Sequence, residues 1–256
     1  MPFDDVYLVS DRLKLVPSKE IDAFEKRIGF PLPFGYREYL TTLGMGIFCE
    51  QLDVQRPSQI ERELKYWQKE FVPIAVEEGF WDNGALLTAD ELSKTVFFAT
   101  NSEGDKFVAC PSKGRVVFEL PRHDSKMRLL KKGFLKPFDC AYGARTRFRF
   151  PFFKPDNNRD RMAQLILKAG VDPMEVWGLV KKTWGKSMRV VEGDPRTSDQ
   201  TIAFIKSIQG GVKLEGGYDT PWFYFEYDVD HRKEVHQVLR RLKPLVETPG
   251  GDWPEN

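Results

Sequence analysis

Apolar residues in the first third of the chain recur at helical spacing. Ile60, Leu64, Trp67 and Phe71 stand at i, i+4, i+7 and i+11, so one face of a helix would carry all four, and Pro73 ends the pattern. The same spacing occurs twice before this segment. The pattern therefore predicts helices over about 18–28, 36–43 and 57–72, with a strand over 47–54 between the last two.

Short apolar runs separated by polar joints follow the third predicted helix. The runs predict three strands, over 96–100, 106–110 and 115–120. Gly104 and Gly114 lie in the two joints, which favours hairpin turns, so we expect an antiparallel meander. A short helix over about 134–142 is expected to close this unit.

A strictly alternating segment begins soon after Gly143. Within residues 145–153 the arginines fall on one side and every second phenylalanine on the other, which predicts a strand with one buried face; the residues are Arg145, Arg147 and Arg149 against Phe148, Phe150 and Phe152. From residue 187 the predicted order is βαββα, as in a ferredoxin-like layer of helices on one antiparallel sheet. In full, the pattern beyond 153 predicts helices over about 158–169, 173–184, 198–208 and 231–246, and strands over 187–192, 212–215 and 222–229.

Composition agrees with this picture. The 256 residues suffice for two small domains, and 41% hydrophobic and 13% aromatic residues can build their cores, which excludes global disorder. We therefore expect an α+β protein with one domain at 1–143 and a smaller α+β domain at 144–256. Three separated cysteines without a CxxC pair indicate reduced thiols. An acidic N-terminus and the lack of a long apolar run indicate a cytoplasmic protein without a membrane segment.

The net charge of +1 conceals a gradient along the chain. Residues 1–100 hold 11 Lys and Arg against 17 Asp and Glu, whereas residues 101–200 hold 21 against 12. The small total excludes a general nucleic-acid coat protein. The contrast between an acidic and a basic segment bears more directly on binding partners.

An ordered series of motifs between residues 17 and 120 is similar to one known family. The series resembles the SUKH superfamily, whose members include fungal cell-wall-assembly regulators and bacterial toxin-immunity proteins. The resemblance covers roughly residues 15–140 and implies an antiparallel central sheet with flanking helices. Its motifs are the helix from Ser18 to Glu25, the turn Gly29-Phe30-Pro31-Leu32-Pro33, the run Tyr36-Arg37-Glu38-Tyr39-Leu40, the stretch Gly44-Met45-Gly46, and Gly104-Asp105 and Gly114-Arg115-Val116-Val117-Phe118 in the later strands.

The function that this resemblance implies is non-catalytic protein binding. In a bacterium it implies an immunity-like protein that binds a toxin domain, encoded nearby, and blocks its active site or substrate path. Many toxin domains that attack nucleic acid are basic, which would suit the acidic first hundred residues. The acidic residues expected to contact such a partner are Glu50, Asp53, Glu61 and Glu63.

The stretch from Arg122 to Arg149 contains nine Lys and Arg against two Asp. Aromatic residues are interleaved, so this basic stretch is a candidate for nucleic-acid binding through phosphate contacts and stacking. Two other interpretations stay open: a solvated or domain-docking face, and contact with an acidic protein surface. The candidate contact residues are Lys131, Lys132, Arg145, Arg147 and Arg149.

An enzyme is a further alternative. Glu226, Asp228 and Asp230 alternate at the end of the strand predicted from residue 222, and three such carboxylates can bind a divalent cation. They are more often the wet face of an antiparallel strand. His231 and His236 lie five apart instead of the four that a shared metal prefers, and no nucleophile elbow or phosphate-binding loop is present. We therefore predict no catalytic residue, no metal ligand and no cofactor.

Overall fold

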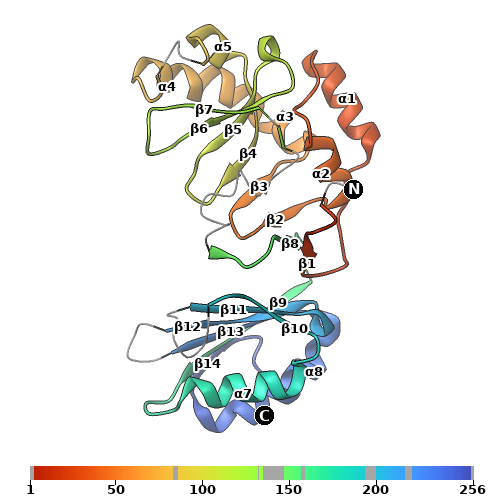
Figure 1. Cartoon of the computed structure of the whole chain (residues 1–256), viewed down its shortest axis with the longest axis vertical. Coiled ribbons are helices and arrows are strands. Elements are labelled where there is room, and N and C mark those ends of the chain that lie inside the picture. Colours follow the sequence, from red (N-terminus) through yellow and green to blue (C-terminus); the bar gives the residue numbers. More distant parts are fainter. Residues whose placement is uncertain are drawn as a thin grey trace. The chain divides into compact units, whose positions relative to one another are not determined.

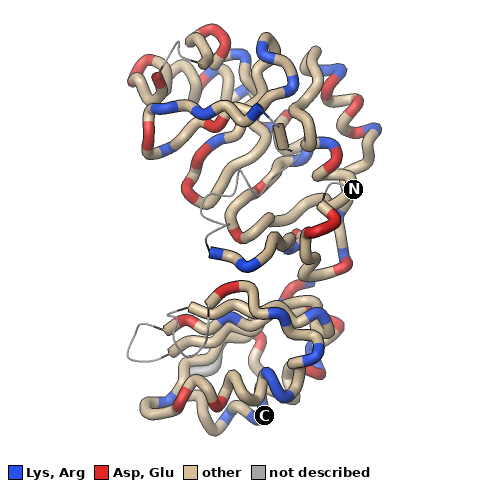
Figure 2. The backbone as a smooth tube through the Cα atoms, in the orientation of Figure 1, with Lys and Arg blue, Asp and Glu red and all other residues tan. Residues whose placement is uncertain are grey.

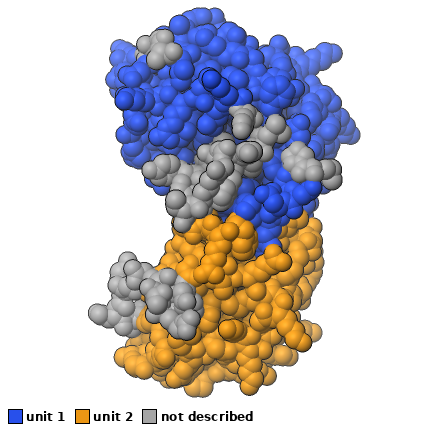
Figure 3. Space-filling view, viewed as in Figure 1, with its two compact units in different colours: residues 1–7, 13–146, 151–156 blue, residues 8–12, 147–150, 157–256 orange. Residues whose placement is uncertain are grey.

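The computed structural model describes residues 3–82, 86–131, 133–134, 147–156, 159–193, 200–216 and 221–254. The chain forms two compact units, each assembled from several segments of the sequence (Figure 3). Unit 1 comprises residues 1–7, 13–146 and 151–156, and unit 2 comprises residues 8–12, 147–150 and 157–256. The predicted domain ranges 1–143 and 144–256 stay a prediction, because their boundary falls outside the described residues.

Unit 1 is built on an eight-stranded sheet with the strand order β1-β8-β2-β3-β4-β5-β6-β7 (Figure 1). Every pairing from β8 to β7 is antiparallel, and β4, β5 and β6 are the predicted meander. The strands are β1 (Tyr7–Leu8), β2 (Gly46–Phe48), β3 (Leu52–Val54), β4 (Val96–Asn101), β5 (Lys106–Ala109), β6 (Val117–Leu120), β7 (Arg128–Leu130) and β8 (Phe152–Pro155).

Helices flank this sheet, as the apolar stripes predict. Tyr36 and Tyr39 of α2 are fully buried and pack edge-to-face on Phe98 of β4 and Phe153 of β8, with ring centroids 5.7 and 5.9 Å apart. α2 therefore covers one face of the sheet. The helices are α1 (Ser18–Ile28), α2 (Tyr36–Thr42), α3 (Pro57–Tyr66), α4 (Val72–Glu77) and α5 (Ala89–Ser93).

The third predicted helix does not end at Pro73. α3 passes into a π-helical turn, Trp67–Phe71, and then into α4, whose first turn contains Pro73. The N–H of Val72 donates to the carbonyl of Trp67, five residues earlier. This wider turn accommodates a residue that has no N–H to donate and that would clash inside a regular helix. The apolar stripe therefore continues across the turn.

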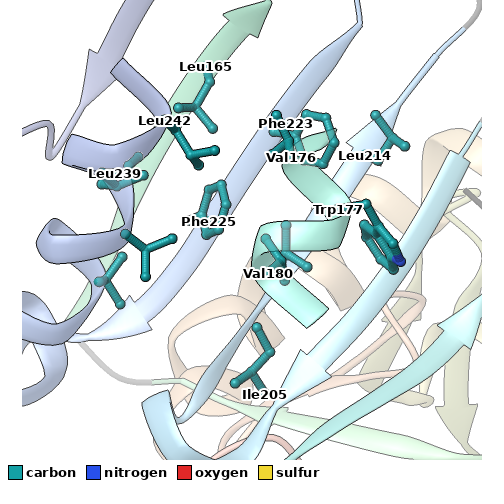
Figure 4. Packing of buried hydrophobic residues seen from close by; sticks show 14 of the residues in the cluster. Leu165, Val176, Trp177, Val180, Ile205, Leu214, Phe223, Phe225, Leu239 and Leu242 are labelled. Atoms are coloured by element: carbon teal, nitrogen blue, oxygen red, sulfur yellow. The ribbon is translucent and has the colours of Figure 1, made fainter. Parts of the chain in front are cut away.

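Unit 2 is a six-stranded antiparallel sheet with the order β10-β11-β12-β13-β9-β14. Its two helices lie over one face, where Val176 and Trp177 of α7 and Leu239 of α8 pack on Phe223 and Phe225 of β13 (Figure 4). The elements are β9 (Asp160–Leu167), α7 (Pro173–Trp184), β10 (Met188–Glu192), β11 (Gln200–Ile205), β12 (Gly210–Glu215), β13 (Trp222–Asp228), α8 (Arg232–Leu242) and β14 (Val246–Gly251). Among the described residues, no helix has the length and apolar character needed to cross a membrane.

The α+β class is confirmed, but two helices predicted in unit 2 are strands. The segment predicted as a helix over 158–169 contains β9, and the one over 198–208 contains β11. In β9 the residues Ala163, Leu165 and Leu167 are buried at every second position, which is the period of a strand. From residue 187 the order is therefore four strands, a helix and a strand, instead of βαββα.

Two predictions in unit 1 also differ from the structure. The single strand predicted over 47–54 is a hairpin, because Cys49 and Glu50 adopt left-handed conformations (φ +51° and +52°) between β2 and β3. The strand predicted over 145–153 begins only at Phe152, and residues 147–150 belong to unit 2. Apart from Phe134, the helix predicted over 134–142 lies outside the described residues.

Cys49, in the β2–β3 turn, is fully buried. Burial raises the pKa of its thiol to about 12, and the thiol donates to the carbonyl of Phe152 with a 3.6 Å separation. Because the thiolate is the nucleophile, we expect Cys49 to resist iodoacetamide at pH 8 in the native protein and to react after unfolding in guanidinium. Peptide mapping by mass spectrometry checks this, and rapid native labelling of Cys49 would contradict it.

Candidate functional site

One row of side chains crosses the sheet of unit 1 from β8 to β5. Lys154, Ile47, Asp53, Thr100 and Lys106 stand opposite one another in successive strands and therefore share one face. This face is the one opposite to α2, since Phe48 and Phe153 alternate with Ile47 and Lys154 along their strands.

Helical segments cover only part of this face. Toward β6 it joins a buried cluster, in which Phe97, Val108 and Phe118 pack with Trp67 and Val72 of the π-helical turn and α4. On β2 and β3 the side chains are exposed instead, and Ile47 leaves 46% of its surface open to solvent in the middle of a paired strand. We call Ile47, Asp53, Glu63 and Asp156 the open-face group.

Asp53 is the central acidic residue of the open-face group. Partial desolvation raises the pKa of its carboxyl group, and the negative charges of Asp156 and Glu63 raise it further. No described residue donates a hydrogen bond to the Asp53 carboxylate or forms an ion pair with it. An exposed carboxylate in such a negative field would gain stability from a cationic partner.

The two other acidic members have weak internal partners. Glu63 on α3 accepts a hydrogen bond from the Gln55 amide (3.0 Å). The Asp156 carboxylate lies 3.5 Å from the Lys14 ammonium, and the side chains of Lys14 and Asp156 are both well exposed. The exposed Lys14–Asp156 pair contributes little to stability, and the neutral Gln55 amide does not neutralise Glu63. The open-face group therefore keeps an acidic character.

The structure brings together two of the four acidic residues that the sequence singles out. Asp53 and Glu63 lie in the open-face group, whereas the carboxylate of Glu61 pairs with Arg27 of α1. Glu50 is exposed in the β2–β3 turn. Sequence reasoning missed Ile47 and Asp156. Only the strand register places them beside Asp53, and no local pattern signals it.

Other acidic residues of the N-terminal half are neutralised within unit 1. Arg37 on α2 pairs with Asp22 (2.6 Å) and Glu25 (2.9 Å) of α1, and Arg56 forms a bidentate pair with Glu20. These ion pairs join α1 to α2 and to the start of α3. The acidic count of the first hundred residues therefore overstates the charge available to a partner.

The described Lys and Arg of the basic stretch divide between the two units, and Lys and Arg occur along the chain in both (Figure 2). Arg147 donates to Glu192 (2.7 Å) and Gln200 (2.8 Å), and the Arg149 guanidinium donates to the carbonyl of Gly193 (2.9 Å). All five of these residues belong to unit 2, whereas Lys131 is an exposed residue of unit 1. Lys132 and Arg145 lie outside the described residues.

Two of the three carboxylates of the enzyme alternative, Asp228 and Asp230, are engaged in ion pairs. Asp228 is fully buried beside the guanidinium groups of Arg12 (3.2 Å) and Arg159 (3.5 Å), which also pair with Asp230. Burial opposes ionisation of Asp228, but the Asp230 N–H and the two arginines outweigh it and lower its pKa. This cluster fastens residues 8–12 to the end of β13. Over the described ranges, no group of three or more His, Cys, Asp and Glu is placed to bind a metal ion.

Unit 1 is an α+β domain in which helices flank a largely antiparallel sheet, the architecture that the SUKH resemblance implies. Residues 16–136 match the model of the SMI1 / KNR4 family (SUKH-1), which confirms the resemblance for the N-terminal half of the chain. No curated protein and no solved structure matches the chain.

Proposed function

We propose that this protein is a non-catalytic, cytoplasmic binding protein whose SUKH-type domain captures a basic protein partner on the open-face group. In a bacterial setting the partner is a toxin domain encoded beside this chain, and capture blocks the toxin's active site or substrate path. The observation that carries the proposal is the exposed Ile47 next to the Asp53 carboxylate, with which no described residue forms an ion pair, on a domain that matches SUKH-1.

The two residues would contribute differently to binding. Ile47 offers an apolar side chain that a partner can bury, and buried apolar anchors surrounded by polar groups supply much of the energy of protein interfaces. Asp53, Glu63 and Asp156 offer a negative field, which accelerates association with a positively charged partner and makes that association sensitive to salt.

The experiment is co-expression of the full chain with the product of the adjacent gene. We expect a complex that co-purifies and a rescue of growth when that product is toxic. Ile47→Asp and Asp53→Lys are expected to weaken the complex at least about tenfold each, roughly 1.4 kcal/mol. Asp53→Lys should also lower the association rate and its salt dependence.

Matched controls lie on α4 of the same unit. Ile74 is 53% exposed and Glu77 is also exposed, so Ile74→Asp and Glu77→Lys repeat the two charge changes away from the open-face group. We expect both controls to bind like the wild type. Absence of a complex and of rescue would overturn the proposal, and equal losses in the controls would overturn the assignment of the surface.

Nucleic-acid binding by the basic stretch is the weaker candidate. Arg147 is already paired with Glu192, and Arg128 lies 3.4 Å from Glu119, so two of its cations have internal carboxylates. A nucleic-acid interface predicts binding that falls steeply with salt. Measurable affinity of the full chain for oligonucleotides at low salt would favour it over the protein partner.

A further inference from the structure

A cleft of about 550 Å³ opens in unit 1 where the π-helical turn meets the β4–β5 turn and the loop between β6 and β7. Its volume lies within the range typical of small-molecule sites. None of the open-face group lines it. The side chains that the argument uses are Phe71, Phe80, Trp81, Lys106 and Arg122.

One wall of the cleft is aromatic. The Trp81 ring lies 6.3 Å from the Phe71 ring and 6.4 Å from the Phe80 ring, measured between centroids. Trp81 is 5% exposed, and its indole N–H donates to the carbonyl of Pro121 (2.8 Å), which fixes its orientation. Phe80 leaves 49% of its surface exposed beside it. Trp81 is therefore fixed at the back of the wall, and Phe80 is accessible to solvent at its edge.

The other wall is cationic. Lys106 is half-buried, with its ammonium 4.7 Å from the centroid of the Phe97 ring. Burial lowers the pKa of Lys106, which the nearby Glu63 opposes and the positive charge of Arg122 reinforces. Within the part of the chain that the structure describes, neither Lys106 nor the Arg122 guanidinium forms an ion pair. Two neighbouring cations without a carboxylate partner favour an anion.

The backbone under this wall is held in place by hydrogen bonds. The N–H of Arg122 donates to Asp105 (2.8 Å), and the Asn101 amide donates to the same carboxylate (2.8 Å). The Arg122 side chain lies against Gly104, where an added Cβ would come within 2.8 Å of its Cδ. Asp124, the acidic residue that lines the cleft, accepts from the N–H of Lys126 (3.0 Å). The cationic wall is therefore preformed.

We propose that this cleft binds a small organic anion in which a carboxylate or phosphate group is attached to an aromatic body. Lys106 and Arg122 contact the anionic group, and Arg122 can do so in a bidentate manner. Phe71, Phe80 and Trp81 contact the aromatic body through stacked or edge-to-face packing. This site goes beyond partner binding, and its test needs no partner.

The experiment is isothermal titration calorimetry on the full chain, with Trp81 in the cleft as a fluorescence reporter. The probes are indole-3-acetate for the carboxylate source and adenosine 5′-monophosphate for the phosphate source. Indole and adenosine serve as uncharged analogues, and acetate and inorganic phosphate as anionic groups alone. We expect one of the two probes to bind, and its uncharged analogue and its anionic group alone to bind at least tenfold more weakly.

Three variants test whether the probe binds in the cleft. Arg122→Gln and Phe80→Ala change exposed side chains, so the fold is expected to persist, and each should weaken the probe at least tenfold. Lys26→Gln, an exposed lysine of α1 that does not line the cleft, is the matched control and should bind like the wild type. Failure of both probes to bind at millimolar concentration, or equal binding by wild type and Arg122→Gln, would overturn the proposal.

Discussion

Phe225→Ala is expected to lower the free energy of unfolding of unit 2 by about 3–5 kcal/mol. Phe225 is fully buried in β13 and lies in the cluster shared with α7 and α8, with its ring centroid 6.4 Å from that of Trp184. Truncation removes the ring and leaves a cavity that strands paired on both sides of β13 cannot close. Domains of this size are stable by only about 5–15 kcal/mol, so the loss is large.

Guanidinium denaturation with hydrogen exchange on the strands of unit 2 measures this effect. The control is Met162→Ala, because Met162 lies on β9, next to β13, but its side chain is 47% exposed. We expect the control to change stability by less than about 0.5 kcal/mol. A similar loss of stability in both variants would contradict the conclusion that burial of Phe225 in the core stabilises unit 2. Binding of the partner by Phe225→Ala also tests whether unit 2 takes part in recognition.

Gly44→Ala is expected to destabilise unit 1 by about 3 kcal/mol. Gly44 has φ +81°, a left-handed conformation that costs alanine about 1–2 kcal/mol. In addition, a Cβ at this position would lie 2.3 Å from the backbone oxygen of Lys14, which accepts the N–H of Met45 (3.0 Å). Backbone cannot rotate away as a side chain can, so residues 14 and 15 would have to move.

Gly29→Ala is the matched control for Gly44→Ala. Gly29 ends α1 with the same φ of +81°, but nothing lies within 4 Å of an added Cβ. We expect this control to lose only the conformational part, about 1–2 kcal/mol. Thermal and urea denaturation of both variants measure the difference. Equal losses would show that the close approach of Lys14 contributes nothing.

Local patterns predicted the parts of the fold that depend on neighbours in sequence. The helical stripes ending at Gly29 and including Trp67 to Phe71, and the short runs of the β4–β6 meander, agree with the structure. They failed for β9 and β11, whose residues carry enough apolar character for either a helix or a strand. β9 becomes a strand because β13 and β14 pair with it on both sides.

The candidate site could be predicted only in part, for a similar reason. The acidic character of the first hundred residues is a property of composition, and it led to the prediction of Asp53 and Glu63 as contact residues. The neutralisation of Glu61 by Arg27 depends instead on the packing of α1 beside α3. The cleft is lined by Phe71 and Arg122, which lie far apart in the chain. Nothing in the sequence of the Pro121–Asp124 turn predicts that aromatic side chains lie opposite it.

The sequence by itself determined the α+β class, the SUKH resemblance of the N-terminal half and the positions of most helices of unit 1, because these follow from spacing, turn residues and ordered motifs. The tertiary structure decided the register that places Ile47 beside Asp53, the strands β9 and β11, and which charges are paired within a unit. Cross-strand neighbours and ion pairs join residues that are distant in sequence. Their free energies exist only once the chain has folded, so no local pattern can encode them alone.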